Sequence, residues 1–129
     1  MRCRDPPRQN AQAEQFADAT NLIHEYVDTD DDDADAYVTL CVHAGIAASD
    51  VICCARLGEH AKGESHNEAV VLLKRVDTDA AKHLSVLLGL KTKSGYSHMP
   101  ATRDEVKRAG RAAEALIETA RRTNAAVGG

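Results

Sequence analysis

Hydrophobic residues run almost without interruption through AYVTLCVHAGIAASDVICCARL, residues 36–57. A helix that is apolar on nearly every side is buried on all sides. At this length it spans about 33 Å, the height of a small bundle. Small residues fill its middle and allow neighbouring helices to approach closely: Ala44, Gly45, Ala47, Ala48 and Ser49. The pattern predicts a central helix on which the rest of the chain packs.

Hydrophobic residues at steps of three and four predict further helices on either side of the central one. The first covers about residues 10–27, where Phe16, Ala19, Ile23 and Tyr26 form one stripe. The last begins near residue 102 and buries a longer stripe: Val106, Ala109, Ala113, Leu116, Ile117 and Ala120. Its outer face carries Lys107, Arg111, Glu114 and Glu118.

Capping residues predict where these helices begin and end. Gly58 follows the central helix and is suited to a left-handed stop. The sequences S-x-x-E at Ser65 and T-x-x-E at Thr102 are capping boxes that open helices. Residues 77–79 interrupt the helix that begins at Ser65. The helix resumes after them and is expected to end around Gly89. The segment LKTKSGYSHMP, residues 90–100, is expected to be irregular.

Together these elements predict an all-α fold, an antiparallel four- or five-helix up-down bundle around a long buried central helix. The composition agrees, since 43% of residues are hydrophobic, only 3% are aromatic, and alternating β-branched stretches are missing. At 129 residues the chain is expected to form one domain, with flexible ends at residues 1–9 and 124–129.

The central stretch is also long enough to cross a membrane. His43 and Asp50 lie inside it and Arg56 lies near its end, and charged side chains are costly within a bilayer. A membrane partner is therefore not expected.

Cysteine usage gives no sign of a metal centre or a disulfide framework. Cys41, Cys53 and Cys54 lie on the central helix and are read as small buried hydrophobes. No C-x-x-C motif occurs, which argues against zinc. The expected setting is a reducing cytoplasm, and no cofactor is predicted.

Acidic and basic residues are concentrated in different parts of the chain. Ten acidic residues and no Lys or Arg stand between Arg8 and Arg56, whereas residues 91–122 hold eight of the sixteen basic residues. The simplest interpretation is an acidic and a basic face that are solvated or paired with each other. The acidic run DTDDDDAD, residues 28–35, alternates like a calcium loop, but Asp33 and Thr39 stand where Gly and Glu are required.

One cluster of residues has the chemistry to handle a phosphate: Lys91, Lys93, Tyr96 and His98. His can transfer a proton near neutral pH, and Lys neutralises a phosphate as a point charge. The Tyr ring offers a surface for stacking a base. Such residues are more often plain surface groups, and both interpretations stay open.

His43 and Asp50 form a second candidate site on the central helix. They are seven residues apart and so share one face, about 10 Å apart along the axis. One interpretation pairs each with a polar group of another helix. The other places their face along a cleft near Lys91 or Lys93, with a binding role.

The long alanine-rich second helix and the K-T-K-S-G-Y-S-H segment before the last helix resemble the HEPN superfamily, in particular the small actinobacterial-type HEPN-like proteins. The resemblance covers roughly residues 14–122 and is strongest in AGIAASDVICCARLG, SHNEAV and LKTKSGY. It implies metal-independent RNA cleavage by an R-x4–6-H motif, at a cleft between two copies of the domain.

This sequence departs from that motif. Lys93 stands four residues before His98 and Lys91 stands six before it, so that Lys replaces Arg at both spacings. Lys lacks the bidentate fork of Arg, and nuclease activity is therefore doubtful. The resemblance also implies a homodimer, RNA as a ligand and pairing with a nucleotidyltransferase-like antitoxin. The alternative hypothesis is a non-catalytic dimerisation or protein-interaction module that assembles through Ala47 and Ala48.

Overall fold

The computed structural model describes residues 14–15, 17–19, 21, 31–59, 66–96 and 101–128. Four helices are complete enough to be labelled: α2 (Asp31–Leu57), α3 (His66–Lys74), α4 (Thr78–Tyr96) and α5 (Arg103–Gly128). The described residues between 14 and 21 are also helical and lie within the predicted first helix. The fold is an all-α bundle around the long helix α2, as the sequence predicts.

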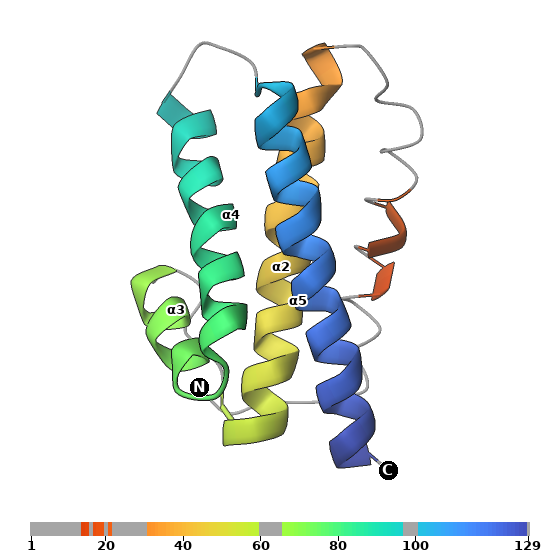
Figure 1. Cartoon of the computed structure of the whole chain (residues 1–129), viewed down its shortest axis with the longest axis vertical. Helices are drawn as coiled ribbons and strands as arrows, with labels where there is room; N and C mark the ends of the chain where they lie inside the picture. The colour runs from red at the N-terminus through yellow and green to blue at the C-terminus, as the bar shows by residue number, and fades with distance from the viewer. Residues whose placement is uncertain are drawn as a thin grey trace.

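Figure 1 shows α4 running antiparallel to both α2 and α5, with the short α3 packed on the outside of α4. Helices α2 and α5 run in the same direction and lie side by side. The start of α2, the end of α4 and the start of α5 therefore meet at one end of the bundle.

Small residues allow α2 to contact α4 and α5 closely. Ala44 and Ala48 of α2 and Ala109 of α5 are fully buried. A Cβ at Gly45 would overlap the Cδ1 of Leu87 and lie 3.2 Å from the Cδ1 of Leu116. The small-residue face that the alternative hypothesis assigns to dimerisation is therefore used inside the chain, and Ala47 also packs against the core.

Local capping chemistry sets the described helix ends. Thr102 and Glu105 form the predicted capping box: the N–H of Glu105 donates to Thr102 Oγ1 at 3.1 Å, and the N–H of Thr102 donates to Glu105 Oε1 at 2.9 Å. Gly58 stops α2 with a φ of +71°. Asp77 caps α4, because its Oδ1 accepts from the N–H of Ala80. The predicted cap Ser65 lies outside the described residues.

Two helices are longer than the sequence predicts. Helix α4 does not end near Gly89 but continues to Tyr96, so the predicted irregularity of residues 90–96 is wrong. Gly89 has no positive φ, and Leu90 is buried against the bundle, which continues the helix past the glycine. Helix α5 includes residues 124–128, expected to be flexible, and the buried Thr123 hydroxyl donates to the carbonyl of Thr119. Residues 1–9 lie outside the described residues.

Helix α2 is buried on most sides but not on all, which corrects the sequence prediction. An open stripe follows it at helical spacing: Ala36, Thr39, Leu40, His43, Ile46 and Asp50 are exposed or half-buried. By length and composition alone, Ala34–Leu57 could cross a membrane, and 61% of its most apolar window is buried within the bundle. Burial of this kind is what the core helix of a soluble protein shows.

The three cysteines of α2 differ from one another. Cys41 and Cys53 are free and buried, as predicted, and burial raises the pKa of each thiol to about 11. Cys54 is buried as well but takes part in a disulfide whose partner lies outside the described residues. A disulfide does not fit the reducing setting that the cysteine pattern predicts.

Substitution of Gly45 tests the close packing of α2. We expect Gly45→Ala to lower the free energy of unfolding by about 1–2 kcal/mol, because overpacking against Leu87 outweighs the gain in helix propensity. Gly89→Ala is the matched control, since a Cβ there meets nothing within 4 Å. It should raise the free energy of unfolding by up to about 1 kcal/mol. Denaturant titration measures both, and equal stabilisation by the two substitutions would contradict the packing argument.

Candidate functional site

The predicted phosphate-handling residues fall at the end of the bundle where α4 meets α5. Lys91, Lys93 and Tyr96 occupy the last turns of α4 rather than a loop, and Lys91 is exposed. His98 lies outside the described residues. Helix positions two apart do not share a face, so the helical backbone separates positions 91 and 93. The prediction that these residues form one loop cluster is wrong for its α4 members.

Helix α5 adds cations at the same end. Arg103, Lys107 and Arg111 recur every four residues along one exposed flank, and Arg108 is exposed on the side toward α4. Among the described residues, neither these four side chains nor Lys91 forms an ion pair or hydrogen bond. We call Lys91, Arg103, Lys107 and Arg108 the basic end. The i, i+4 spacing was readable from the sequence and would have singled out Arg103.

The acidic run contributes to the same end of the bundle. Asp31–Asp35 form the first turns of α2, where carboxylates are favoured by the helix dipole. Asp35 Oδ1 accepts a hydrogen bond at 2.9 Å from the N–H of Ala101, just before α5. This contact holds the start of α5 against the start of α2, but its donor is a backbone N–H and not a basic side chain. Next to this contact, an open groove of about 500 Å³ lies between α4 and α5. Leu90 and Arg108 are among the residues that line it.

His43 and Asp50 share the open stripe of α2, so the prediction of a common face is confirmed. His43 is exposed and Asp50 is half-buried, and each has an interaction partner. Neither lines the α4–α5 groove nor the cavity described next. Within the described ranges, no three His, Cys, Asp or Glu side chains gather as a metal site would require.

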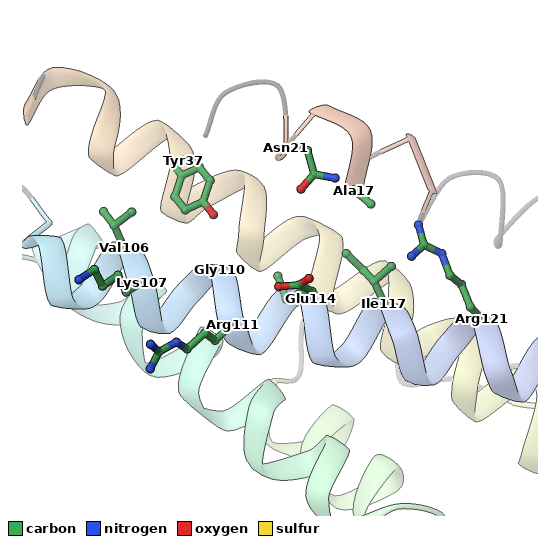
Figure 2. Close-up of a pocket in the computed structure, with 11 residues that line it drawn as sticks. Ala17, Asn21, Tyr37, Val106, Lys107, Gly110, Arg111, Glu114, Ile117 and Arg121 are labelled. Atoms are coloured by element: carbon green, nitrogen blue, oxygen red, sulfur yellow. The ribbon is translucent and has the colours of Figure 1, made fainter. Parts of the chain in front are cut away.

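A second hollow, of about 300 Å³, lies where the first helical segment covers α2 and α5 (Figure 2). We call it the Tyr37 groove. The residues that line it are Ala17, Asn21, Tyr37, Val106, Lys107, Gly110, Arg111, Ala113, Glu114, Ile117 and Arg121. Sequence reasoning placed Lys107, Arg111 and Glu114 on the outer face of the last helix but did not predict a hollow beside them.

Tyr37 is positioned by the glycine opposite it. Its side chain reaches from α2 to α5, and a Cβ at Gly110 would lie 2.6 Å from the Tyr37 hydroxyl oxygen. Burial raises the pKa of Tyr37 above its usual range, helped by Cys41, to which the hydroxyl is hydrogen-bonded, and by the negative charge of Glu114. The hydroxyl therefore stays protonated at neutral pH and acts as a hydrogen-bond donor.

An ion pair connects the first helical segment to α5 at the edge of the Tyr37 groove. Arg121 donates through Nε to Glu14 Oε1 at 2.6 Å and through its terminal nitrogen to Glu14 Oε2 at 2.9 Å. This bidentate bond lowers the pKa of Glu14. The two side chains are 46% and 36% exposed, so solvent screens the pair and limits its contribution to stability to about 1 kcal/mol or less.

Comparison with known proteins adds no relative: the chain matches no family model, no curated protein and no solved structure. The resemblance to the HEPN superfamily stays a prediction from the sequence motifs. The geometry of the basic end and of the Tyr37 groove is therefore the basis on which function can be argued.

The Glu14–Arg121 pair predicts a pH-dependent contribution to stability. Because the folded state lowers the pKa of Glu14, the contribution is present above the ordinary pKa of 4.5 and is lost as pH falls through the folded value. We expect Glu14→Gln to be less stable than the wild type by up to about 1 kcal/mol at pH 7. The difference should disappear in acid. Unfolding titrations of both proteins across this range measure it, and a difference independent of pH would argue against the pair.

Proposed function

We propose that this protein is a HEPN-like helical domain that binds RNA through its basic end. The observation that carries the proposal is the set of exposed cations at the junction of α4 and α5, of which Lys91, Arg103, Lys107 and Arg108 have no anionic partner among the described residues. Surface cations that lack a protein partner are available to phosphates.

The arrangement suits a phosphate backbone better than a single ion. Arg103 and Lys107 are one helical turn apart, about 6 Å along the axis, and Lys91 and Arg108 widen the surface toward α4. Binding to such a surface is mainly electrostatic, so it releases counterions and weakens steeply with salt. The chain as a whole has a net charge of −4, so an electrostatic attraction to RNA has to come from a local basic surface.

Removal of three cations of the basic end should weaken RNA binding in a salt-dependent way. We expect Lys91→Ala/Arg103→Ala/Arg108→Ala to reduce affinity for a single-stranded RNA at low salt. The slope of log affinity against log salt should fall by about 2, since each lost phosphate contact removes about 0.7. Fluorescence anisotropy at several salt concentrations measures both quantities.

The matched control removes the same charge elsewhere. Lys74→Ala/Arg75→Ala/Lys82→Ala deletes three exposed cations near the end of α3 and the start of α4, at the opposite end of the bundle. It should leave the salt slope close to that of the wild type. An equal loss in the control would mean that RNA responds only to total charge, and the basic end would not be the site.

The proposal includes slow catalysis at the same end of the bundle. In the resemblance, Arg stabilises the charge on the phosphate and His moves a proton, whereas Lys93 supplies one point charge without a fork. We therefore expect slow RNA cleavage that persists in chelator and is lost in His98→Ala. Lys93→Arg restores R-x4-H and should raise the rate.

Gel analysis of RNA incubated with each protein at micromolar concentration measures this cleavage. Cleavage that persists in His98→Ala would come from another site or a contaminant. If none of the three proteins cleaves, the domain is a non-catalytic binding or dimerisation module, which is the alternative hypothesis.

The resemblance also supplies the remaining parts of the proposal: a homodimer in which two basic ends face each other, and a nucleotidyltransferase-like antitoxin as partner. A facing dimer binds one RNA per two chains, a stoichiometry that the same titration reports. The proposed location is the cytoplasm, and the disulfide at Cys54, uncommon in reducing compartments, is the observation that counts against it.

A further inference from the structure

The disulfide at Cys54 has one candidate partner within the chain. The sequence contains four cysteines: Cys3, Cys41, Cys53 and Cys54. Cys41 and Cys53 are free thiols, whereas Cys54 is disulfide-bonded. The two free thiols are excluded as partners, so the cysteine that remains is Cys3, which lies outside the described residues. A bond between Cys3 and Cys54 closes a loop that contains the first helical segment and most of α2.

Cys54 lies at the end of the bundle opposite the basic end. It stands in the last turns of α2, where its carbonyl accepts from the N–H of Gly58 at 3.0 Å. Figure 1 places the end of α2 and the end of α5 at the same end of the bundle, away from the start of α5. Cys54 is 8% exposed, against 3% for Cys53 and 0% for Cys41. It is therefore the cysteine of α2 that lies nearest to solvent.

The first helical segment begins near this same end of the bundle. Glu14 is bonded to Arg121, which lies in the second half of α5. Asn21, further along the segment, lines the groove beside Tyr37, which belongs to the first half of α2. The segment therefore runs opposite to α2. Residues 3–14 can extend over roughly 36 Å, more than three times the spacing of about 10 Å between packed helices, so a bond to the end of α2 is within reach.

Few noncovalent contacts hold the first helical segment on the bundle. Among its described residues, only Ala17 is buried. The Glu14–Arg121 ion pair is largely exposed and is screened by solvent. Chain continuity attaches the segment to the start of α2, and the disulfide attaches it to the end of the same helix. Attachment at both ends reduces the number of undocked conformations and so favours the docked one.

We propose that Cys54 is bonded to Cys3 and that this bond is a redox-sensitive tether, which holds the first helical segment on α2 and α5 while it is oxidised. A dithiol opens the tether. One thiolate of the dithiol attacks a sulfur of the disulfide and displaces the other sulfur as a thiolate, and the second thiol then closes the dithiol into its own disulfide. Two electrons and two protons pass to Cys3 and Cys54, which become free thiols.

The neighbouring thiol of Cys53 does not open the tether. Burial raises the pKa of Cys53 to about 11, so its thiol stays protonated at neutral pH, and the thiolate is the form that attacks a disulfide. The tether is therefore closed in an oxidising compartment and open where an external dithiol keeps thiols reduced. This inference concerns the disulfide alone and does not depend on RNA binding at the basic end.

Reduction frees one end of the first helical segment. The docked state then loses the advantage of the closed loop, and the segment leaves α5 for part of the time. Ala113 and Ile117 of α5 line the Tyr37 groove together with Ala17 and are buried. Undocking of Ala17 exposes this apolar surface. The reduced protein is therefore expected to be less stable and to be opened first at this segment.

Peptide mapping of the full chain, purified in oxidising buffer and kept free of reductant, tests the pairing. We expect a fragment in which Cys3 and Cys54 are linked, and alkylation of the denatured protein at Cys41 and Cys53 alone. Dithiothreitol should separate the linked fragment. A disulfide between two chains, or alkylation of Cys54 without reductant, would overturn the proposal.

Thermal unfolding with and without dithiothreitol tests the effect of the closed loop. Reductant should lower the midpoint of the wild type by about 5–15 °C, because a loop of about 50 residues is opened. Cys54→Ser and Cys3→Ser should unfold at a lower temperature than the oxidised wild type and should not respond to reductant. No response in the wild type, or an unchanged response in Cys54→Ser, would contradict the tether.

Cys53→Ala is the matched control, because Cys53 neighbours Cys54 and is a free thiol. The substitution removes a buried side chain and lowers the midpoint itself, but the additional shift on reduction should equal that of the wild type. Loss of the shift in Cys53→Ala would assign the redox response to the wrong cysteine and overturn the proposal.

Limited proteolysis with a protease that cleaves after Glu shows where the reduced protein opens. Cleavage after Glu14 should precede cleavage after Glu118 of α5, because only the first helical segment has been released. The oxidised protein should resist cleavage at both residues. Simultaneous cleavage at Glu14 and Glu118 in the reduced protein would indicate general loosening of the bundle and would rule out a tether.

Discussion

The close approach of α2 to its neighbours is the constraint on which the rest of the bundle depends. Helices α2 and α5 run in the same direction and touch because their contact positions hold Gly or Ala: Gly45 admits Leu116 of α5, and Gly110 admits the Tyr37 hydroxyl. Gly45 also admits Leu87 of α4, so one glycine serves both contacts of α2. The register of this contact also decides what α5 presents to solvent, because the face opposite Tyr37 is fixed once Gly110 lies beneath its ring.

Local chemistry is the part of this fold that the sequence predicts well. Capping at Thr102, the left-handed turn at Gly58 and the helix break at Asp77 each depend on a few neighbouring residues, and each is present. The misjudged features depend on partners distant in sequence. Helix α4 passes Gly89 because Leu90 is buried against the bundle. The open stripe of α2 exists because only part of its circumference is covered by other helices.

The same distinction between local and long-range causes applies to the candidate site. The sequence predicts phosphate-binding residues between Lys91 and His98, and the fold does bring the end of α4 to a basic surface. Its α5 members are Arg103, Lys107 and Arg108, and only the antiparallel contact of α4 and α5 places them at the same end of the bundle as Lys91. The Tyr37 groove was not predictable, since it depends on how Ala17 and Asn21 lie against two other helices.

Acidic and basic residues lie at the same end of the bundle, and the way the carboxylates are bonded explains why they do not neutralise the cations there. The only acidic group of the run for which a contact is described, Asp35, is directed to a backbone N–H rather than to a basic side chain. Glu105 is likewise used within the capping box. Because these two carboxylates accept from backbone donors, the neighbouring Arg and Lys side chains stay exposed. Helix α5 can therefore begin in an acidic environment and still present Arg103, Lys107 and Arg111 to a phosphate-bearing ligand.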